Sequence, residues 1–387
     1  MKEKKFQLGN VLTISTAHML HDIFTAFLAI LLPLLREKIG FSLVLAGFLP
    51  VALRFPNLIN PIIGSYSDKL KLRYLVAAAP IVASISMTLL GVATNYATVV
   101  ILLLIAGFGS TLIHVPSPVL IKLVSGDKKG MGMSFYMLGG ELARALGPLV
   151  VTAAVSIWTL EGIWRIIPIG VCLSLLIYVK ISKVEREAIP QKAGKSAETH
   201  KDIMKLMLPV FLSVAGINIF QGIMRQSLMT FLPTYMKANG STIVMASIAL
   251  SIMQFSGAIG TFTAGTISDV IGRKKALLIM AIITPILMIT YTMTSGVLAI
   301  VILTFLGFFM FFANPIILAY IHDFDTSKQA FVNGVFMTIS FVISSLASLV
   351  IGFLGDAIDL NTTFRIGGIL AFGVIPIVLF MKEKKKN

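Results

Sequence analysis

The stretch Gly64-Ser65-Tyr66-Ser67-Asp68-Lys69, followed by Arg73, lies between two long apolar segments in the first half of the chain. A related stretch in the second half, Gly265-Thr266-Ile267-Ser268-Asp269 followed by Gly272-Arg273, has the same apolar flanks. Other short pieces recur at nearly the same offset: Leu31-Leu32-Pro33 with Phe231-Leu232-Pro233, and Gly107-Phe108 with Gly307-Phe308. Repeats whose equivalent loops lie on one side of a membrane are parallel. The sequence therefore predicts two copies of one membrane unit.

The composition supports a membrane protein, with 57% hydrophobic and 13% charged residues and a mean hydropathy of +0.93. A bilayer core about 30 Å thick needs roughly 20 apolar residues per helix. We therefore predict an all-α integral membrane protein with twelve transmembrane helices in two six-helix pseudo-repeats. The expected spans are Val11–Leu35, Leu43–Tyr66, Leu75–Ala93, Val99–Val124, Met131–Trp158, Ile163–Ile181, Leu206–Tyr235, Ile243–Ile267, Ala276–Met293, Val297–Ile321, Phe331–Leu354 and Phe364–Met381.

The predicted domains follow from this repeat. We expect an N-terminal six-helix bundle over 1–182, a cytoplasmic basic linker over 183–205 and a C-terminal six-helix bundle over 206–387. The linker is rich in Lys and Glu and also contains Pro190 and Gly194, a composition typical of a solvated tether.

The net charge of +15 does not indicate nucleic-acid binding, because most of the 32 Lys and Arg residues fall in the tails and in alternate loops. This distribution follows the positive-inside rule and predicts that both termini are cytoplasmic. We expect a multi-pass protein of the cell inner (plasma) membrane, in contact with the lipid bilayer, with no nucleic-acid partner, and monomeric. The single cysteine, Cys172, excludes an intramolecular disulfide.

Three titratable residues lie within the first expected span: His18, His21 and Asp22. The i, i+4 spacing places His18 and Asp22 on one helix face, which Thr25 continues. Ionisable groups inside a membrane are costly and usually functional, and a carboxylate beside imidazoles can change charge near neutral pH. We predict that Asp22 takes up the coupling proton with help from the two histidines. The alternative is a capping or packing cluster near the inner surface.

Three arginines also lie in the interior of expected spans, well away from the span ends: Arg54, Arg144 and Arg225. Guanidinium groups bind carboxylate and phosphate-like groups, so we predict that they contact an anionic or zwitterionic substrate. The alternative is that they neutralise buried acids. This alternative is strong for Arg144, because Glu141 lies three residues earlier on the same helix. We also include Glu141 among the candidate proton-coupling residues.

Two proline sites extend the candidate substrate set. His114 directly precedes Val115-Pro116-Ser117-Pro118, where the prolines predict a kink beside an imidazole. The second-half equivalent is Asn314-Pro315, and Gln221 lies one helical turn before Arg225. We include His114, Gln221 and Asn314 as candidate substrate-binding residues, although a histidine at a kink is more often a packing residue.

The spans, the repeated GxxxD stretch and the basic central loop resemble the major facilitator superfamily over essentially the whole chain. The first half further resembles its fosmidomycin-resistance-type efflux permeases, through His18 with His21-Asp22, Leu31-Leu32-Pro33-Leu34-Leu35, Gly107-Phe108-Gly109-Ser110, His114 with Pro116, and Gly139-Gly140 with Gly147-Pro148. This resemblance implies a proton-coupled exporter. It also implies that the repeated charged stretches gate the two halves; the candidate gating residues are Gly64, Asp68, Arg73, Gly265, Asp269 and Arg273.

We therefore predict a secondary active transporter that exports a small anionic or amphiphilic compound in exchange for protons by alternating access. It is expected to be no enzyme and to need no cofactor, and the chain lacks the G-x-x-x-x-G-K-[ST] motif of ATP-driven pumps. Proton-coupled import of an organic anion is the first alternative. A divalent-metal carrier that uses His18, His21 and Asp22 is another, although we predict no resident metal. A polytopic enzyme or receptor is the non-transport alternative, with His322-Asp323 and Asp325 as its best candidate cluster.

Overall fold

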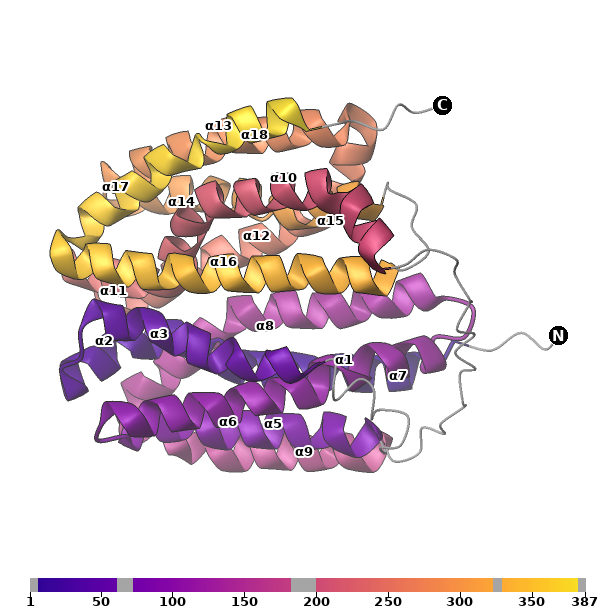
Figure 1. Ribbon diagram of the computed structural model, residues 1–387. Coiled ribbons are helices and arrows are strands. Elements are labelled where there is room, and N and C mark those ends of the chain that lie inside the picture. The colour runs from indigo at the N-terminus through magenta and orange to yellow at the C-terminus, as the bar shows by residue number, and fades with distance from the viewer. Residues whose placement is uncertain (1–5, 61–71, 182–199, 323–328, 382–387) are drawn as a thin grey trace. The chain divides into compact units, whose positions relative to one another are not determined.

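The computed structural model describes residues 6–60, 72–181, 200–322 and 329–381, and within these ranges every regular element is helical (Figure 1). Eleven helical segments of the described chain are long and apolar enough to cross a membrane, and Leu43–Ile59 is a shorter apolar segment. The predicted all-α membrane fold is confirmed. The elements of the first half are α1 (Leu8–Thr25), α2 (Phe27–Ile39), α3 (Leu43–Arg54), η1 (Phe55–Ile59), α5 (Leu72–Leu89), η2 (Leu90–Val92), α6 (Tyr96–His114), α7 (Pro116–Val124), α8 (Lys129–Trp158), η3 (Ile163–Ile166) and α9 (Ile167–Ile181).

The second half has the same character. Its elements are α10 (His200–Gln226), the π-helical turn η4 (Ser227–Phe231), α11 (Leu232–Ala238), α12 (Ile243–Ile271), α13 (Arg273–Thr292), α14 (Gly296–Met310), α15 (Ala313–His322), α16 (Gln329–Ala357), α17 (Leu360–Ala371) and α18 (Val374–Phe380).

Two expected spans are broken at matching places in the repeat. The span Val99–Val124 is divided between α6 and α7 at Val115, directly before Pro116. The span Val297–Ile321 is divided between α14 and α15 shortly before Pro315. Proline has no N–H and its ring clashes with the preceding helical turn, but it fits the first turn of a new helix. The predicted kink beside His114 is therefore a helix boundary.

The second expected span, Leu43–Tyr66, is helical over a shorter length. The helix α3 ends at Arg54, and the chain continues in the 3-10 turn η1, which has Pro56 in its first turn. The residue before a proline disfavours the α conformation, which explains why regular α-helix stops there. The rest of that span lies largely outside the described residues.

The described residues divide into two compact units: unit 1 takes those of Met1–Ser42, Phe48–Ile189 and Met236–Ser251, and unit 2 the remainder. The division differs from the expected bundles over 1–182 and 206–387 by two short exchanged segments. The described helix α10 begins at His200, within the range 183–205 expected as a linker, and residues 182–199 lie outside the described chain. The domain boundaries stay a prediction.

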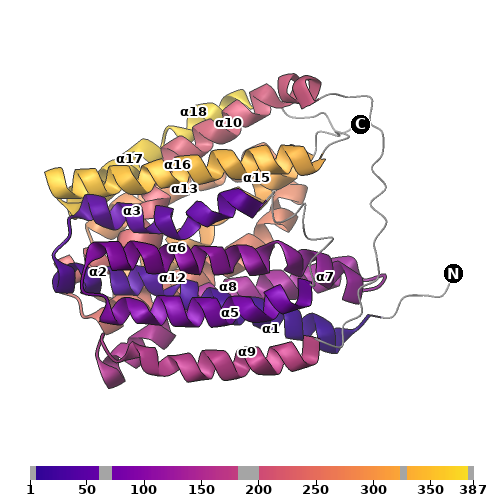
Figure 2. The ribbon, with the colours of Figure 1, turned by 60° about the horizontal axis from the view of Figure 1, so that its bottom comes forward.

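Within unit 1, α1 packs along α8 on one side and along α5 on another (Figure 2). The helices α1 and α8 approach closely because glycines of α8 face α1. A Cβ atom added at Gly139 would lie 2.7 Å from the Ser15 carbonyl oxygen, and one at Gly147 would lie 2.7 Å from that of Ile23. The small residues of α8 therefore allow tight helix packing.

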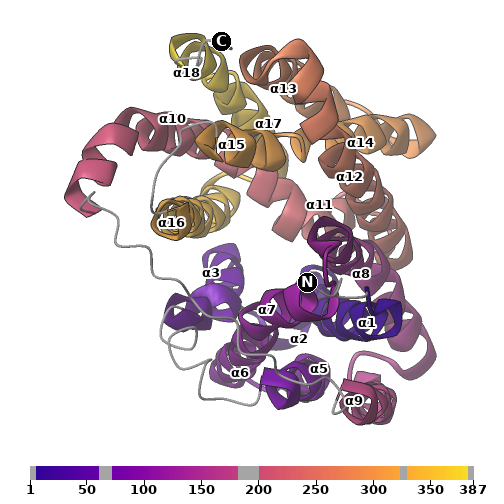
Figure 3. The ribbon, with the colours of Figure 1, turned by 90° about the vertical axis from the view of Figure 1, so that its right-hand side faces the viewer.

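Within unit 2, α10 packs against α16 and α17, and α13 packs against α14 and α17 (Figure 3). A core of fully buried apolar side chains from several of these helices includes Met207, Leu277 and Ile316. The segment Leu43–Gly47 belongs to this unit. Asp356 explains this membership, because its carboxylate accepts hydrogen bonds of 2.9 Å from the backbone N–H groups of Leu43 and Val44 and so caps α3.

Candidate functional site

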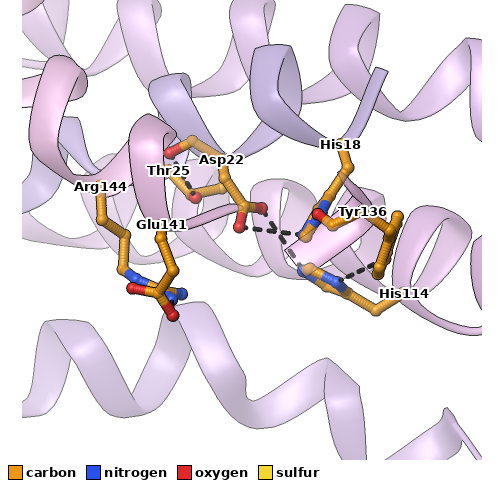
Figure 4. Close-up of polar contacts among 7 residues, drawn as sticks. All are labelled: His18, Asp22, Thr25, His114, Tyr136, Glu141 and Arg144. Atoms are coloured by element: carbon orange, nitrogen blue, oxygen red, sulfur yellow. Dashed lines mark hydrogen bonds and ion pairs between the residues drawn. The ribbon is translucent and has the colours of Figure 1, made fainter. Parts of the chain in front are cut away.

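The predicted histidine and aspartate cluster exists, and it includes a residue from a second helix (Figure 4). His18 Nε2 lies 3.2 Å from Asp22 Oδ2, as the i, i+4 spacing on α1 predicts. His114, the last residue of α6, places Nε2 3.5 Å from Asp22 Oδ1. Asp22 therefore has one imidazole on each carboxylate oxygen. The side chains of His18 and Asp22 are 6% and 9% exposed, so this cluster lies inside the helix bundle.

A glycine makes room for the cluster. A Cβ atom added at Gly140 of α8 would lie 2.7 Å from His18 Cε1 and 3.3 Å from Asp22 Oδ2. Cβ atoms do not approach ring atoms at 2.7 Å without displacing them. Gly140 thus lets α8 pass directly beside the His18 ring.

Tyr136 is a member of the site that the sequence reasoning missed. The His18 ring stacks on the Tyr136 ring with centroids 4.0 Å apart, and His18 Nδ1 lies 2.9 Å from the Tyr136 carbonyl oxygen. The Tyr136 hydroxyl lies 3.5 Å from His114 Nδ1. One signal could have identified it: Tyr136 lies one helical turn before Gly140, at the head of the stripe of small residues that faces α1.

His21 is placed differently from its predicted partners. Its Nδ1 lies 3.4 Å from the Ala79 carbonyl oxygen on α5, and its ring centroid is 5.8 Å from that of His114. Nε2 of His21 is buried and has no hydrogen-bond partner among the described residues. Thr25 does not extend the cluster either, because its hydroxyl donates to the Asp22 backbone carbonyl over 3.2 Å.

The second polar pair of unit 1 is the predicted one between Glu141 and Arg144 on α8. Arg144 Nη2 donates to Glu141 Oε1, and the two side chains are 37% and 14% exposed, respectively. Two atoms of the pair, Glu141 Oε2 and Arg144 Nε, have no hydrogen-bond partner in the described chain. Arg144 therefore neutralises Glu141, as the alternative to substrate binding expects. Both side chains keep an atom that can still form a hydrogen bond.

Arg54 is the last residue of α3. The chain directly after Arg54 forms the 3-10 turn η1, which contains Asn57.

Two of the three predicted polar residues of unit 2 contact each other. Arg225 donates from Nη1 to Asn314 Oδ1 over 2.9 Å, and its guanidinium carbon lies 5.6 Å from the ring centroid of Phe311. Gln221 is buried and places Nε2 3.0 Å from the Met280 sulfur. Phe311 is a second residue that the sequence reasoning missed.

The candidate gating residues fall partly within the described chain. Gly64 and Asp68 lie outside it, and of Arg73 only the helical backbone is described. The second copy is helical and not a loop: Gly265 and Asp269 belong to the end of α12, and Gly272, with φ of 94°, separates it from α13. Asp269 Oδ1 lies 2.6 Å from Arg273 Nη1.

Gly265 makes no close helix contact within the described chain, because an added Cβ would meet no atom within 4 Å.

His18, Asp22 and His114 could together hold a metal ion, since one donor atom from each lies within 4.8 Å of the others. Two imidazoles and a carboxylate suit first-row divalent ions. The set differs from the one predicted for a metal carrier, because His114 takes the place of His21. The polytopic-enzyme cluster cannot be compared, because Asp323 and Asp325 lie outside the described residues and only the backbone of His322 is described.

The model of the Major Facilitator Superfamily matches residues 14–340 and 214–387 of this chain. The chain belongs to the major facilitator superfamily. It is similar to the fosmidomycin resistance protein of Escherichia coli (strain K12), with 24% identity over 378 residues that cover 95% of this chain and 91% of that protein. It is also similar to the uncharacterized MFS-type transporter YfnC of Bacillus subtilis (strain 168), with 22% identity over 384 residues, 97% of this chain and 94% of that protein.

Solved structures agree on the fold of this major facilitator protein. A bacterial homologue of the human lysosomal transporter Spinster, inward-facing and unoccupied, gives a TM-score of 0.78 at 14% identity, covering 97% of this chain and 95% of that one. A D-xylose-proton symporter gives 0.76 at 18% identity, with 97% of each chain covered. The predicted family and fold are confirmed, and the protein is a membrane transporter.

Proposed function

We propose that this major facilitator protein is a proton-coupled antiporter that exports a small anionic or amphiphilic compound by alternating access. Asp22 takes up the coupling proton, with His18 as its partner and His21 and Glu141 as secondary titratable groups. The observation that carries the proposal is the burial of Asp22 between two imidazoles.

The position of Asp22 argues against the capping alternative. Asp22 lies three residues before the end of α1, and its carboxylate oxygens contact imidazole nitrogens instead of a helix N-terminus. A buried carboxylate with neutral neighbours is costly in a membrane protein, and protonation of either partner reduces that cost. A site whose charge changes by one proton is what a proton-driven transporter requires.

Each unit has its own cationic group for an anionic substrate. In unit 1 we assign substrate contact to Arg54, Arg144 and His114; Arg144 has spare hydrogen-bonding capacity, and His114 is 37% exposed at its side chain. In unit 2 we assign it to Gln221, Arg225 and Asn314. Guanidinium groups favour planar or tetrahedral oxyanions because they donate two parallel hydrogen bonds.

The resemblance to a fosmidomycin resistance protein supports export, and a phosphonate is the first compound to test. The decisive experiment is proton flux in proteoliposomes under an imposed pH gradient, challenged with phosphonates, organic anions and cationic drugs. The proposal expects flux triggered by an anion, lost in Asp22→Asn and weakened in Arg225→Ala. Anion transport with no proton movement would overturn it.

The direction of coupling distinguishes export from import. With the pH gradient reversed, an antiporter moves anion against the proton flow, whereas a symporter moves both together. The same vesicles report both outcomes. We also propose an inner-membrane location with both termini cytoplasmic, a monomer as the working unit, and gating by the two charged stretches that contain Asp68 and Asp269.

A divalent metal ion is the second candidate cargo, because of the donor set His18, Asp22 and His114. Flux of Mn²⁺ or Zn²⁺ into the same vesicles tests it directly. Metal uptake lost in His114→Gln, with no response to any anion, would favour the metal carrier.

A further inference from the structure

His18 is held by two contacts that together determine where its hydrogens lie. Its Nδ1 lies 2.9 Å from the backbone carbonyl oxygen of Tyr136. A carbonyl oxygen only accepts hydrogen bonds, so Nδ1 must carry a hydrogen. Stacking of the His18 ring on the Tyr136 ring keeps this orientation.

The opposite nitrogen of the same ring faces Asp22. His18 Nε2 lies 3.2 Å from Asp22 Oδ2. If His18 is neutral, its single hydrogen is on Nδ1, and Nε2 presents a lone pair. An ionised Asp22 also presents a lone pair, so the two atoms would repel each other inside the helix bundle. When no cation bridges the two atoms, the observed contact requires one further proton between Nε2 and Oδ2.

His114 completes a consistent pattern around Asp22. The Tyr136 hydroxyl can donate to His114 Nδ1, which lies 3.5 Å away. His114 then carries its own hydrogen on Nε2, which faces Asp22 Oδ1 at 3.5 Å. His114 therefore needs no additional proton to satisfy Asp22, and the additional proton belongs to the His18 contact.

We infer that His18 and Asp22 hold the transported proton jointly, between Nε2 and Oδ2, and that Tyr136 is the positioning residue that imposes this arrangement. The inference rests on the proposed function and assigns the proton to two atoms. Bound, the pair is either imidazolium with carboxylate or imidazole with carboxylic acid, with no net charge. When the proton leaves to water, the pair has one negative charge and the contact becomes repulsive. Proton release therefore separates His18 from Asp22.

Other titratable groups surround the pair. His21 of α1 and His114 of α6 have ring contacts with each other, and Glu141 and Arg144 of α8 are paired mutually. On the remaining helices packed against α1, neither His18 nor Asp22 has an ion pair with a described residue. The titratable residues of those helices are Arg36, Glu37 and Lys38 in α2, Arg73 and Tyr74 in α5, Lys122 in α7, and Cys172, Tyr178 and Lys180 in α9.

The test is spectroscopic and uses the full chain in lipid nanodiscs with ¹⁵N-labelled histidine and ¹³C-labelled aspartate. Free histidine titrates near pH 6.5, so at about pH 8 an unperturbed ring is neutral. The inference expects one extra proton on the pair there: a doubly protonated His18 signal or the infrared band of a protonated Asp22. Neutral His18 together with ionised Asp22 in the wild type would overturn it.

Single variants assign the signals and provide the control. His18→Gln keeps an N–H donor that faces Asp22 but adds no proton, so the extra proton should disappear and pH-driven exchange should fall at least about tenfold. His200→Gln, at the start of α10, removes a histidine outside the cluster and should change neither readout.

Tyr136 is tested by its side chain, because every variant retains the backbone carbonyl. Tyr136→Phe keeps the ring stack and should retain the His18 signal while it shifts the pH profile of exchange through His114. Tyr136→Leu removes the stack as well and should lose the signal. An unchanged signal and pH profile in both variants would refute the positioning role.

The two proposals can fail separately. If wild-type vesicles show no pH-driven flux, the proposed antiport is wrong. If Asp22→Asn abolishes the flux but His18→Gln retains it, antiport stands and the shared proton is refuted.

Discussion

Arg225 of α10 donates a 2.9 Å hydrogen bond to Asn314, the second residue of α15. The guanidinium also lies over the ring of Phe311. An asparagine oxygen and an aromatic face therefore both contact the guanidinium and help to position it. Unit 2 therefore presents a positioned cation near a helix boundary.

Arg225→Gln should weaken transport of an organic anion mainly through KM. Loss of one charge-assisted contact corresponds to about 1.5–3 kcal/mol, which is roughly a 10- to 100-fold increase in KM. Concentration series in proteoliposomes measure it. The matched control is Arg365→Gln, whose guanidinium hydrogen-bonds Thr292 in the same unit. An equal loss in both variants would show a general effect on the fold.

Asn314→Ala tests whether orientation of the guanidinium matters. Removal of the Asn314 side chain leaves the charge of Arg225 but takes away this hydrogen bond, so we expect a smaller increase in KM, about 3- to 10-fold, consistent with one hydrogen bond of about 0.5–1.5 kcal/mol. Asn314→Asp should increase KM further, because the added carboxylate would offset the charge of Arg225 and repel an anion. A KM unchanged by either substitution would exclude this part of unit 2 from the substrate path.

Gly140→Ala should abolish pH-driven exchange, because the added methyl would lie 2.7 Å from His18 Cε1 and displace the ring from Asp22. Gly130→Ala is the matched control on the same helix, since a Cβ there meets no atom within 4 Å. Proton flux and thermal stability are measured for both. Normal flux in Gly140→Ala would mean that the His18 position is not needed.

Glu141→Gln removes the partner of Arg144 and should destabilise the protein by about 1–3 kcal/mol, the cost of an unpaired polar group. The pair is partly exposed, so the larger costs of fully buried pairs do not apply. A double-mutant cycle with Arg144→Gln measures the coupling. If Arg144 also contacts substrate, its loss will increase KM even in the Glu141→Gln background; otherwise KM will stay constant.

Asp359 at the start of α17 should make stability depend on acid pH. Its carboxylate accepts from the Thr362 backbone N–H over 2.8 Å and from the Thr362 hydroxyl over 2.7 Å, and these bonds lower the pKa of Asp359 below its usual value of 3.8. A lowered folded-state pKa gives stability that is present above the unfolded pKa and is lost as pH falls through the folded one. Asp359→Ala should cost about 0.5–2 kcal/mol at neutral pH. The wild-type and variant melting curves should converge below about pH 4; a constant difference would contradict the cap.

Much of this protein could be predicted from one-dimensional patterns. The lengths of the apolar runs, the repeated glycine and aspartate stretch and the family resemblance were sufficient for the membrane fold. The contact of His18 with Asp22 was also predictable, because residues four apart on a helix are neighbours in any tertiary structure. The same reasoning identified Glu141 with Arg144, three residues apart.

Contacts between helices were decided only by the tertiary structure. The approach of α8 to α1 brings Tyr136 onto His18, and the end of α6 brings His114 to Asp22, across sequence separations that no periodicity encodes. Packing also turned His21 away toward α5. Residue types and local spacing determine which groups are available and which faces they share. Which of them meet depends on the rotation and depth of each helix against its neighbours, and those are set by the summed packing of many side chains, including glycines such as Gly140 whose effect is the space that they leave.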